Sequence, residues 1–231
     1  MSISRPDAKK TEHTADVLLL TSIPPKKISG PPDPDGHSEW MVHGPTKAKV
    51  INAPGYPQPV PKPKASCGIQ PAYVIKQTPN MGLGVFATRD IEMGELIFAE
   101  RPLLVSPRGN VAMRVDPKVQ HYSLKTQMAI AMMEWEKTLE AAVGRMEPED
   151  KKAFMELANS HKDDGSGPIL GIIRTNGFMV GSNIFDGPEM RADGNNAYSG
   201  VVKIGSRINH RYVHLAFFSL VFEQYYYMHF Y

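Results

Sequence analysis

Apolar residues recur at three- and four-residue steps through the middle of the chain, and this spacing gives the clearest structural signal. The stripe comprises Leu124, Met128, Met132, Trp135, Leu139 and Val143, positions that share one face of a helix. Asp116 before Pro117 predicts the start of the helical region, and Gly144 predicts the end of this helix. A second helix is expected from Pro148, with Phe154, Leu157 and Ala158 buried. We therefore expect a helical insert over about 116–160.

Short apolar runs separated by turn residues lie on both sides of this insert and predict strands. Before it they cover 73–76, 85–87 and 96–100, with another starting near 103–105. After it they cover 169–173, 177–180 and 197–204. Such short runs are typical of small antiparallel sheets. The pattern predicts an α+β fold.

The first 66 residues lack this periodicity and are rich in proline. Twelve of the 20 prolines lie in residues 1–64, and five of them fall within 54–63. Since proline removes a backbone donor and fixes φ, we expect 1–66 to be a disordered arm with local polyproline II character. Pro54 and Pro57 have P-x-x-P spacing, so a proline-recognition module is a candidate partner of 54–63. An inert leader is the alternative interpretation.

Composition narrows the class of protein. The chain has 231 residues, a net charge of +2 and a hydrophobic fraction of 42%, enough for a core. The balanced charge argues against direct nucleic-acid binding, and the single cysteine, Cys67, rules out an internal disulfide and a Cys-rich zinc site. The longest apolar runs, near ten residues as in 213–222, are too short to span a bilayer. We expect no membrane partner and an intracellular location, in nucleus or cytoplasm.

Three segments, in order along the chain, resemble parts of a SET domain. Residues 82–97 read GLGVFATRDIEMGELI, similar to the family's opening G-x-G turn followed by I-x-x-G-E and an apolar strand. Residues 174–178, RTNGF, resemble the N-x-F segment of the SET-and-MYND (SMYD-like) branch, to which single-domain fungal SET proteins are related. Residues 206–210, SRINH, resemble the start of the second signature, N-H-S-C-x-P-N.

The resemblance implies a transferase, an S-adenosyl-L-methionine-dependent protein-lysine methyltransferase. Its substrate would be a protein with a target lysine, histone or non-histone, and protein lysine methylation needs no metal. The cofactor-binding residues implied are Gly82, Leu83, Gly84, Asn176, Ser206, Asn209 and His210. In the residues themselves, glycines allow close backbone approach to a ligand, and methyl transfer needs mainly orientation and electrostatics.

The resemblance stops after the Asn209–His210 pair. Arg211, Tyr212 and Val213 stand where the family continues Ser-Cys-x-Pro-Asn, and the later tyrosine motif and the pseudoknot it completes have no counterpart, so no catalytic residue is assigned. Nine of the 20 aromatic residues lie in 211–231. We expect a partial SET domain over 67–210 and an aberrant aromatic tail over 211–231. Because codons for Arg-Tyr-Val can contain GTACGT, an intron-donor sequence, we hypothesise that the tail is translated intron.

Two functional interpretations follow from this partial match. In the first, the chain is a SET methyltransferase that is inactive or impaired as truncated, binding the cofactor weakly or not at all. In the alternative, it is a non-catalytic interaction or scaffold protein that uses the proline-rich arm and a SET remnant. Saturable cofactor binding would separate the two.

Overall fold

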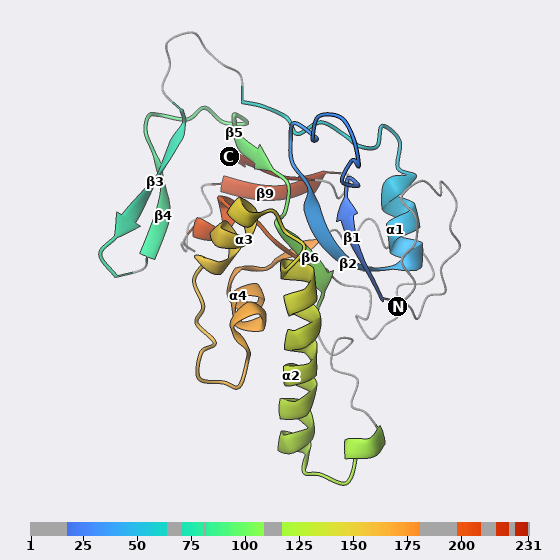
Figure 1. Cartoon of the computed structure of the whole chain (residues 1–231). Helices are drawn as coiled ribbons and strands as arrows, with labels where there is room; N and C mark the ends of the chain where they lie inside the picture. The colour runs from blue at the N-terminus through green and yellow to red at the C-terminus, as the bar shows by residue number, and fades with distance from the viewer. Residues whose placement is uncertain are drawn as a thin grey trace.

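The computed structural model has helices and strands interleaved along the chain, an α+β fold (Figure 1). It describes residues 18–63, 71–80, 82–108, 117–180 and 198–208, and the backbone of two strands at 216–221 and 225–230. The described strands are β1 (Leu18–Ile23), β2 (Ser38–His43), β3 (Tyr73–Thr78), β4 (Gly82–Ala87), β5 (Leu96–Glu100), β6 (Leu104–Pro107), β7 (Phe178–Val180), β8 (Tyr198–Val201), β9 (Ala216–Val221) and β10 (Tyr225–Phe230). The described helices are α1 (Gly44–Ile51), α2 (Leu124–Val143), α3 (Pro148–Met155) and α4 (Pro168–Asn176), with 3₁₀ turns η2 (Pro117–Val119) and η3 (Gly205–Arg207).

A five-stranded sheet in the order β1-β2-β6-β8-β7 forms the centre of the fold. Alternate residues of a strand face opposite sides of a sheet, and the core divides accordingly. Met41 and Leu104 join one apolar cluster with side chains of α2, α3 and α4. Trp40 and Val105 join a second cluster, which includes Val50 of α1. The sheet is therefore covered on both faces.

The expectation that residues 1–66 are disordered is wrong for 18–63. This segment supplies β1, β2 and α1, and Trp40, Met41 and Val42 are fully buried. The prolines do not interrupt these elements. Pro45 sits in the first turn of α1, where a missing N–H costs nothing, and most of the others lie in connections. The prolines of this region lie mostly in its loops, and the short strands between those loops contain the buried core residues. Residues 1–17 and 64–66 lie outside the described residues.

The helical insert is confirmed with a later start. Asp116 lies outside the described residues and Pro117 opens only the turn η2, whereas α2 begins at Leu124 with the Ser123 hydroxyl accepting from Thr126 N at 3.3 Å. Gly144 ends α2 and Pro148 opens α3, as predicted. Phe154 and Leu157 are buried, but Ala158 is exposed and Ala153 is buried in its place.

The strand predicted over 169–173 is wrong, because these residues belong to α4. Pro168 starts the helix, and Ile169, Ile172 and Ile173 are all buried. The helix packs against α2 and β8. An apolar run of this length does not distinguish a buried strand from a buried helix. The strand predicted after it is confirmed by β7.

Two smaller sheets complete the described fold. β3 and β4 form an antiparallel hairpin that stands apart from the central sheet in Figure 1. β5 pairs antiparallel with β10, which pairs with β9, so part of the expected aromatic tail is backbone-paired to the body.

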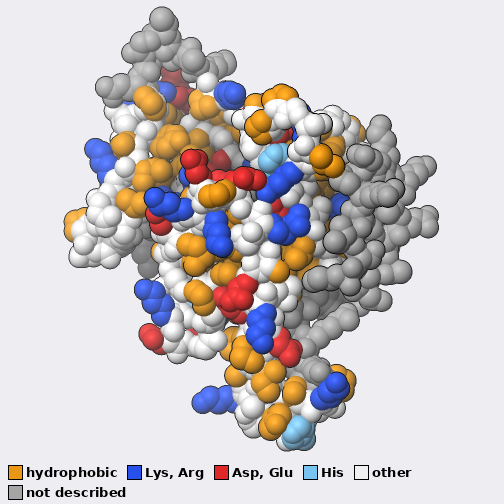
Figure 2. All heavy atoms as spheres, viewed as in Figure 1, with side chains coloured by type: hydrophobic (Ala, Val, Ile, Leu, Met, Phe, Trp, Pro, Cys, Tyr) orange, Lys and Arg blue, Asp and Glu red, His pale blue; other side chains and the backbone are white. Residues whose placement is uncertain are grey.

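The N-terminal half of α2 extends away from the rest of the molecule (Figure 1). Leu124 is 71% exposed and Met128 46% exposed, although both lie on the predicted apolar stripe. In the same view, Figure 2 shows apolar side chains gathered at this end. The stripe is core only from Trp135 to Val143. In the part of the chain that the structure describes, no helix combines the length and the apolar character that crossing a membrane would require.

Candidate functional site

The β3–β4 hairpin presents the Gly82–Leu83–Gly84 segment at its tip. Gly82 has φ of 69°, a left-handed conformation that favours glycine. The Thr78 hydroxyl donates to the Gly82 carbonyl at 2.7 Å and closes the turn. Gly82 and Leu83 are exposed, whereas Gly84 is buried. The hairpin therefore offers an open strand surface supported on one side.

The turn η3, which carries Ser206, lies in contact with β4. The Ser206 hydroxyl accepts from Val202 N at 3.2 Å and donates to the Asn176 carbonyl at 3.3 Å. One hydroxyl thus joins the end of β8, η3 and the end of α4. Because both of its hydrogen bonds go to backbone groups, Ser206 fixes the path of the chain at this point.

Asn176 ends α4 and is 7% exposed. Its side-chain Nδ2 donates to the carbonyls of Ala158 at 2.7 Å and Ile172 at 2.8 Å. A Cβ on the following Gly177 would lie 2.6 Å from the Ile173 carbonyl oxygen and 2.8 Å from Ser199 Oγ. Gly177 therefore permits a close approach of α4 to the sheet, and the amide nitrogen of Asn176 ties the end of α4 to the segment that follows α3.

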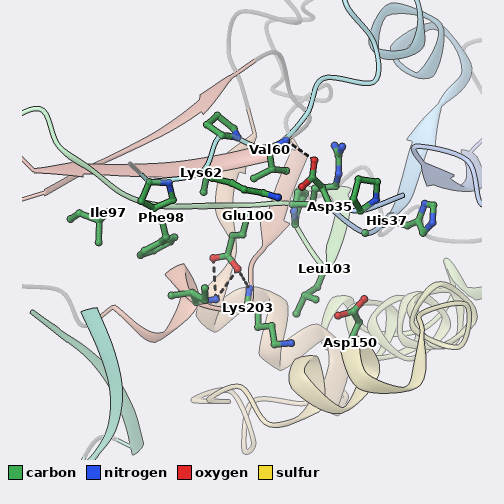
Figure 3. Close-up of a pocket in the computed structure, with 18 of the residues that line it drawn as sticks. Asp35, His37, Val60, Lys62, Ile97, Phe98, Glu100, Leu103, Asp150 and Lys203 are labelled. Atoms are coloured by element: carbon green, nitrogen blue, oxygen red, sulfur yellow. Dashed lines mark hydrogen bonds between the residues drawn. The ribbon is translucent and has the colours of Figure 1, made fainter. Parts of the chain in front are cut away.

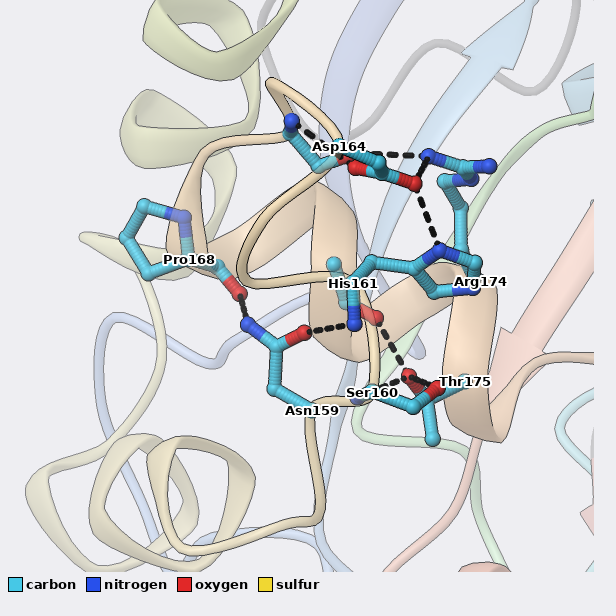
Figure 4. A network of polar contacts seen from close by, with 9 residues as sticks. Asn159, Ser160, His161, Asp164, Pro168, Arg174 and Thr175 are labelled. Carbon is cyan, nitrogen blue, oxygen red and sulfur yellow. Dashed lines mark hydrogen bonds and ion pairs between the residues drawn. The ribbon is translucent and has the colours of Figure 1, made fainter.

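A polar network fixes the loop that precedes α4 (Figure 4). Asp164 accepts from Arg174 Nη1 at 2.6 Å, and His161 Nδ1 lies 2.7 Å from the same carboxylate oxygen. Hydrogen bonds from Ser166 and His161, with Arg174, hold the pKa of Asp164 well below its usual range. Thr175 Oγ1 accepts from Ser160 N at 3.0 Å. The network orients the helix whose last residue is Asn176.

Glu100, the last residue of β5, binds the chain just before Ser206. Its carboxylate accepts from Lys203 N at 3.0 Å, from Ile204 N at 3.0 and 2.9 Å, and from Gly205 N at 2.7 Å (Figure 3). Burial raises the pKa of Glu100 to about 7, although the three backbone N–H groups act in the opposite direction. Three successive amides thus converge on one side chain.

A pocket of about 430 Å³ opens beside this carboxylate (Figure 3). Phe98 and Leu103 form an apolar part of the pocket wall. The proline-rich segment lies along one side, where Val60 N donates to Asp35 Oδ2 at 2.8 Å. The volume suits a small ligand. The charged side chains of the lining are balanced: Asp35, Glu100 and Asp150 against Lys62, Arg101 and Lys203. The charges therefore favour neither an anion nor a cation.

The structure brings part of the predicted cofactor set together. Gly82, Leu83 and Gly84 lie on β4, η3 with Ser206 contacts that strand, and Ser206 bonds to Asn176. Asn209 and His210 lie outside the described residues. The side chains of Ser206 and Asn176 are directed to backbone groups, which makes them supports of the site; their direct contact with a cofactor stays a prediction.

The sequence did not identify Glu100 as part of this site. The SET-like opening ends in an apolar strand with Glu, which Glu100 matches, but a charged residue at the end of an apolar run ordinarily marks only a strand leaving the core. The partners of Glu100 are backbone amides more than 100 positions later. Backbone donors have no sequence signature, so no side-chain pattern pointed to the contact. Among the described residues, no three histidine, cysteine or carboxylate side chains are grouped to hold a metal.

Neither a scan of protein-family models nor a search of curated proteins finds a counterpart. What the chain does must therefore be argued from its own motifs and from the geometry of β4, η3, α4 and Glu100.

Proposed function

We propose that this chain is a SET-type protein whose chemistry is S-adenosylmethionine-dependent methylation of protein lysine. One observation carries the proposal. The three segments that resemble SET signatures lie far apart in sequence, yet β4 contacts η3 and Ser206 of η3 bonds to Asn176. Segments of a common cofactor site must meet in this way, whereas chance matches have no reason to.

The described residues fit the cofactor in part. A Cβ built on Gly82 meets nothing within 4 Å, and Leu83 beside it is 40% exposed, so β4 has open surface next to η3. Gly82 and Leu83 would contact the cofactor there. Ser206 and Asn176 would hold η3 and α4 in place through their backbone partners.

In the proposed reaction the protein forms no covalent bond to the substrate. When bound, the cofactor supplies a methyl group already activated by its positive sulfur. The protein's task is to hold a neutral lysine amine in line with that group and to exclude water, so that orientation and electrostatics carry the rate. The rigid supports of η3 and α4 serve this positioning. No described side chain is assigned as a catalytic residue.

Cofactor binding is the appropriate first test, because it needs fewer parts of the site than turnover does. S-adenosylmethionine would be titrated calorimetrically into the full chain, with Leu83→Lys as the site variant. Leu124→Lys is the matched control, since Leu124 is also exposed but lies on the extended end of α2. We expect saturable binding by the wild type and the control, weakened at least tenfold in Leu83→Lys.

Transfer would be followed with methyl-labelled cofactor and a mixture of histone and non-histone proteins. Label in lysine would identify the substrate class. A correctly folded wild-type chain that shows no saturable cofactor binding would refute the proposal.

The alternative of a non-catalytic interaction protein has one observation in its favour. Pro54, Pro57 and Pro59 are exposed, so a proline-recognition module has access to 54–63. The backbone of the segment is nevertheless tied to the body, because Arg101 Nη2 donates to the Gln58 carbonyl at 3.0 Å. A folded chain that bound such a module and no cofactor would establish this alternative.

A further inference from the structure

We propose that Glu100 is the positioning residue of the cofactor site, holding the 203–206 segment in the place where β4 and α4 meet it. The inference rests on the proposed function and deepens it. Glu100 belongs to none of the matched signature positions at which cofactor contact is predicted. Glu100 would act indirectly, by holding the 203–206 segment in position.

The geometry gives Glu100 control of three successive backbone amides. The carboxylate accepts from Lys203 N, Ile204 N and Gly205 N at 2.7 to 3.0 Å. The next residue is Ser206, whose hydroxyl bonds to Val202 N and the Asn176 carbonyl. A single side chain thus fixes the peptide plane at each step that leads into η3, and the chain continues directly to Asn209 and His210.

Glu100 can act as an anchor because its own backbone is held. β5 pairs antiparallel with β10, with Glu100 opposite Tyr226. On the same strand, Ile97 and Phe98 are buried in a cluster against which Ile204 and Ile208 pack. The apolar packing brings the 204–208 segment to β5, and the carboxylate then sets its orientation. Packing alone is non-directional, so the orientation needs the hydrogen bonds.

The geometry also explains why a carboxylate is needed at this position. Each of its two oxygens accepts from two of the amides, and the three amides need two acceptor oxygens side by side, which a carboxyl group supplies. A glutamine keeps the shape but offers only one acceptor oxygen, and its NH₂ would face an N–H donor. Alanine would leave three amides without their acceptor.

The test compares Glu100→Gln with two controls. Glu95→Gln removes a carboxylate that immediately precedes β5 and pairs with Arg89 instead of with the 203–205 segment. Val50→Ala opens a void in the second core cluster and measures what general destabilisation does to cofactor binding. The readouts are amide hydrogen exchange at 203–206, the calorimetric Kd for S-adenosylmethionine and the thermal midpoint. Glu100→Asp, with the charge kept and the reach shortened, completes the series.

We expect Glu100→Gln to speed exchange at 203–205 at least tenfold and to raise Kd at least tenfold. Glu100→Asp should fall between this variant and the wild type. Glu95→Gln should change neither amide exchange at 203–205 nor Kd. Val50→Ala should lower the thermal midpoint without changing Kd. A merely structural role for Glu100 would instead make Kd follow the thermal midpoint across all four variants.

The possible failures are distinguishable. If the wild type binds the cofactor and Glu100→Gln binds it equally well while exchange at 203–205 rises, the inference is overturned and the proposed function stands. If exchange does not change, the carboxylate does not hold the segment and the inference is overturned at its first step. If the folded wild type binds no cofactor, the proposed function fails and this role of Glu100 fails with it.

Discussion

Two carboxylates in different regions, the buried Glu39 and the half-buried Glu100, have hydrogen-bond partners of different kinds. Glu39, on β2, is 3% exposed and is met by side chains: Arg145 Nε at 3.0 Å, Lys26 Nζ at 3.3 Å and Ser22 Oγ at 2.8 Å. Glu100, on β5, is met by backbone amides of the 203–205 segment.

This difference indicates that Glu39 supports the fold as a whole, whereas Glu100 supports one segment of the candidate site. The partners of Glu39 come from β1, from the loop after it and from the turn between α2 and α3, so Glu39 connects the N-terminal strands to the helical insert. The partners of Glu100 belong to one short segment beside β4. Removing Glu39 should therefore lower the stability of the whole domain, while removing Glu100 should loosen one segment.

The largest effect is expected from Glu39→Ala. Removing one member of a buried ion pair costs roughly 3–5 kcal/mol, and we expect about 3 kcal/mol here because Arg145 and Lys26 are partly exposed and regain water. Urea unfolding measures the change. Glu147→Ala removes an exposed partner of Lys26 and should cost below about 1 kcal/mol. Equal losses in the two variants would contradict the assignment of Glu39 to the fold.

A smaller effect, on the order of 2 kcal/mol, is expected from pH through Glu100. Its pKa is raised from 4.5 to about 7 in the folded state, so the folded chain binds the extra proton. Its contribution to stability is therefore full below about pH 4.5 and is lost as pH rises through 7. The measurement is the unfolding free energy of wild type and Glu100→Gln from pH 4.5 to 8. Lys203 and Tyr73 face the same carboxylate and are common to both proteins. The prediction would be contradicted if the unfolding free energies of wild type and Glu100→Gln differed by the same amount at every pH in this range.

Asn176→Ala should cost about 1.5 kcal/mol, since it removes two hydrogen bonds to backbone carbonyls, one of them buried and the other part-buried. The change should also speed amide exchange around 158–160 and 176–178, because Asn176 connects these segments. Thr138→Ala is the matched control: it too removes a side-chain bond to a helix carbonyl, that of Glu134 at 3.2 Å, but on the exposed side of α2. A loss in Asn176→Ala no greater than that of the control would show that Asn176 does not hold α4.

The smallest stability change, about 1 kcal/mol, is expected from Gly82→Ala. The left-handed φ of 69° is strained for alanine, while the space around the new Cβ is open. Gly94→Ala is a matched control with φ of 80° and the same open surroundings in the turn before β5. Thermal unfolding should give similar losses for both, and calorimetry should show weaker cofactor binding for Gly82→Ala alone. Equal binding by the two variants would remove Gly82 from the site.

Local signals predicted much of the insert and the hairpin. Gly144 and Pro148 bounded their helices because capping and the fixed φ of proline act over a few residues. The strands 73–76 and 96–100 were found from β-branched and aromatic runs bounded by turns. These elements are specified by their own residues, so local sequence patterns are enough to predict them.

The elements that were missed depend on packing between distant segments. Ile169 to Ile173 became a helix because α2 and β8 bury it on several sides, which removes the polar face that would reveal a helical period. The strands of 18–43 are short and lie between prolines, and their burial follows from the β2–β6 pairing. In the candidate site, Gly82 was predicted from a motif, but the role of Glu100 required the backbone of 203–205 to be placed first.

The hydrogen-exchange footprint of S-adenosylmethionine on the full chain tests most directly whether β4 and the 203–208 segment form one cofactor site. We expect saturating cofactor to slow amide exchange at 82–87 and 203–208 and to leave exchange in β1 and β2, around Glu39, unchanged. Cofactor that binds but protects neither 82–87 nor 203–208 would contradict this expectation, because the ligand would then occupy a different part of the molecule.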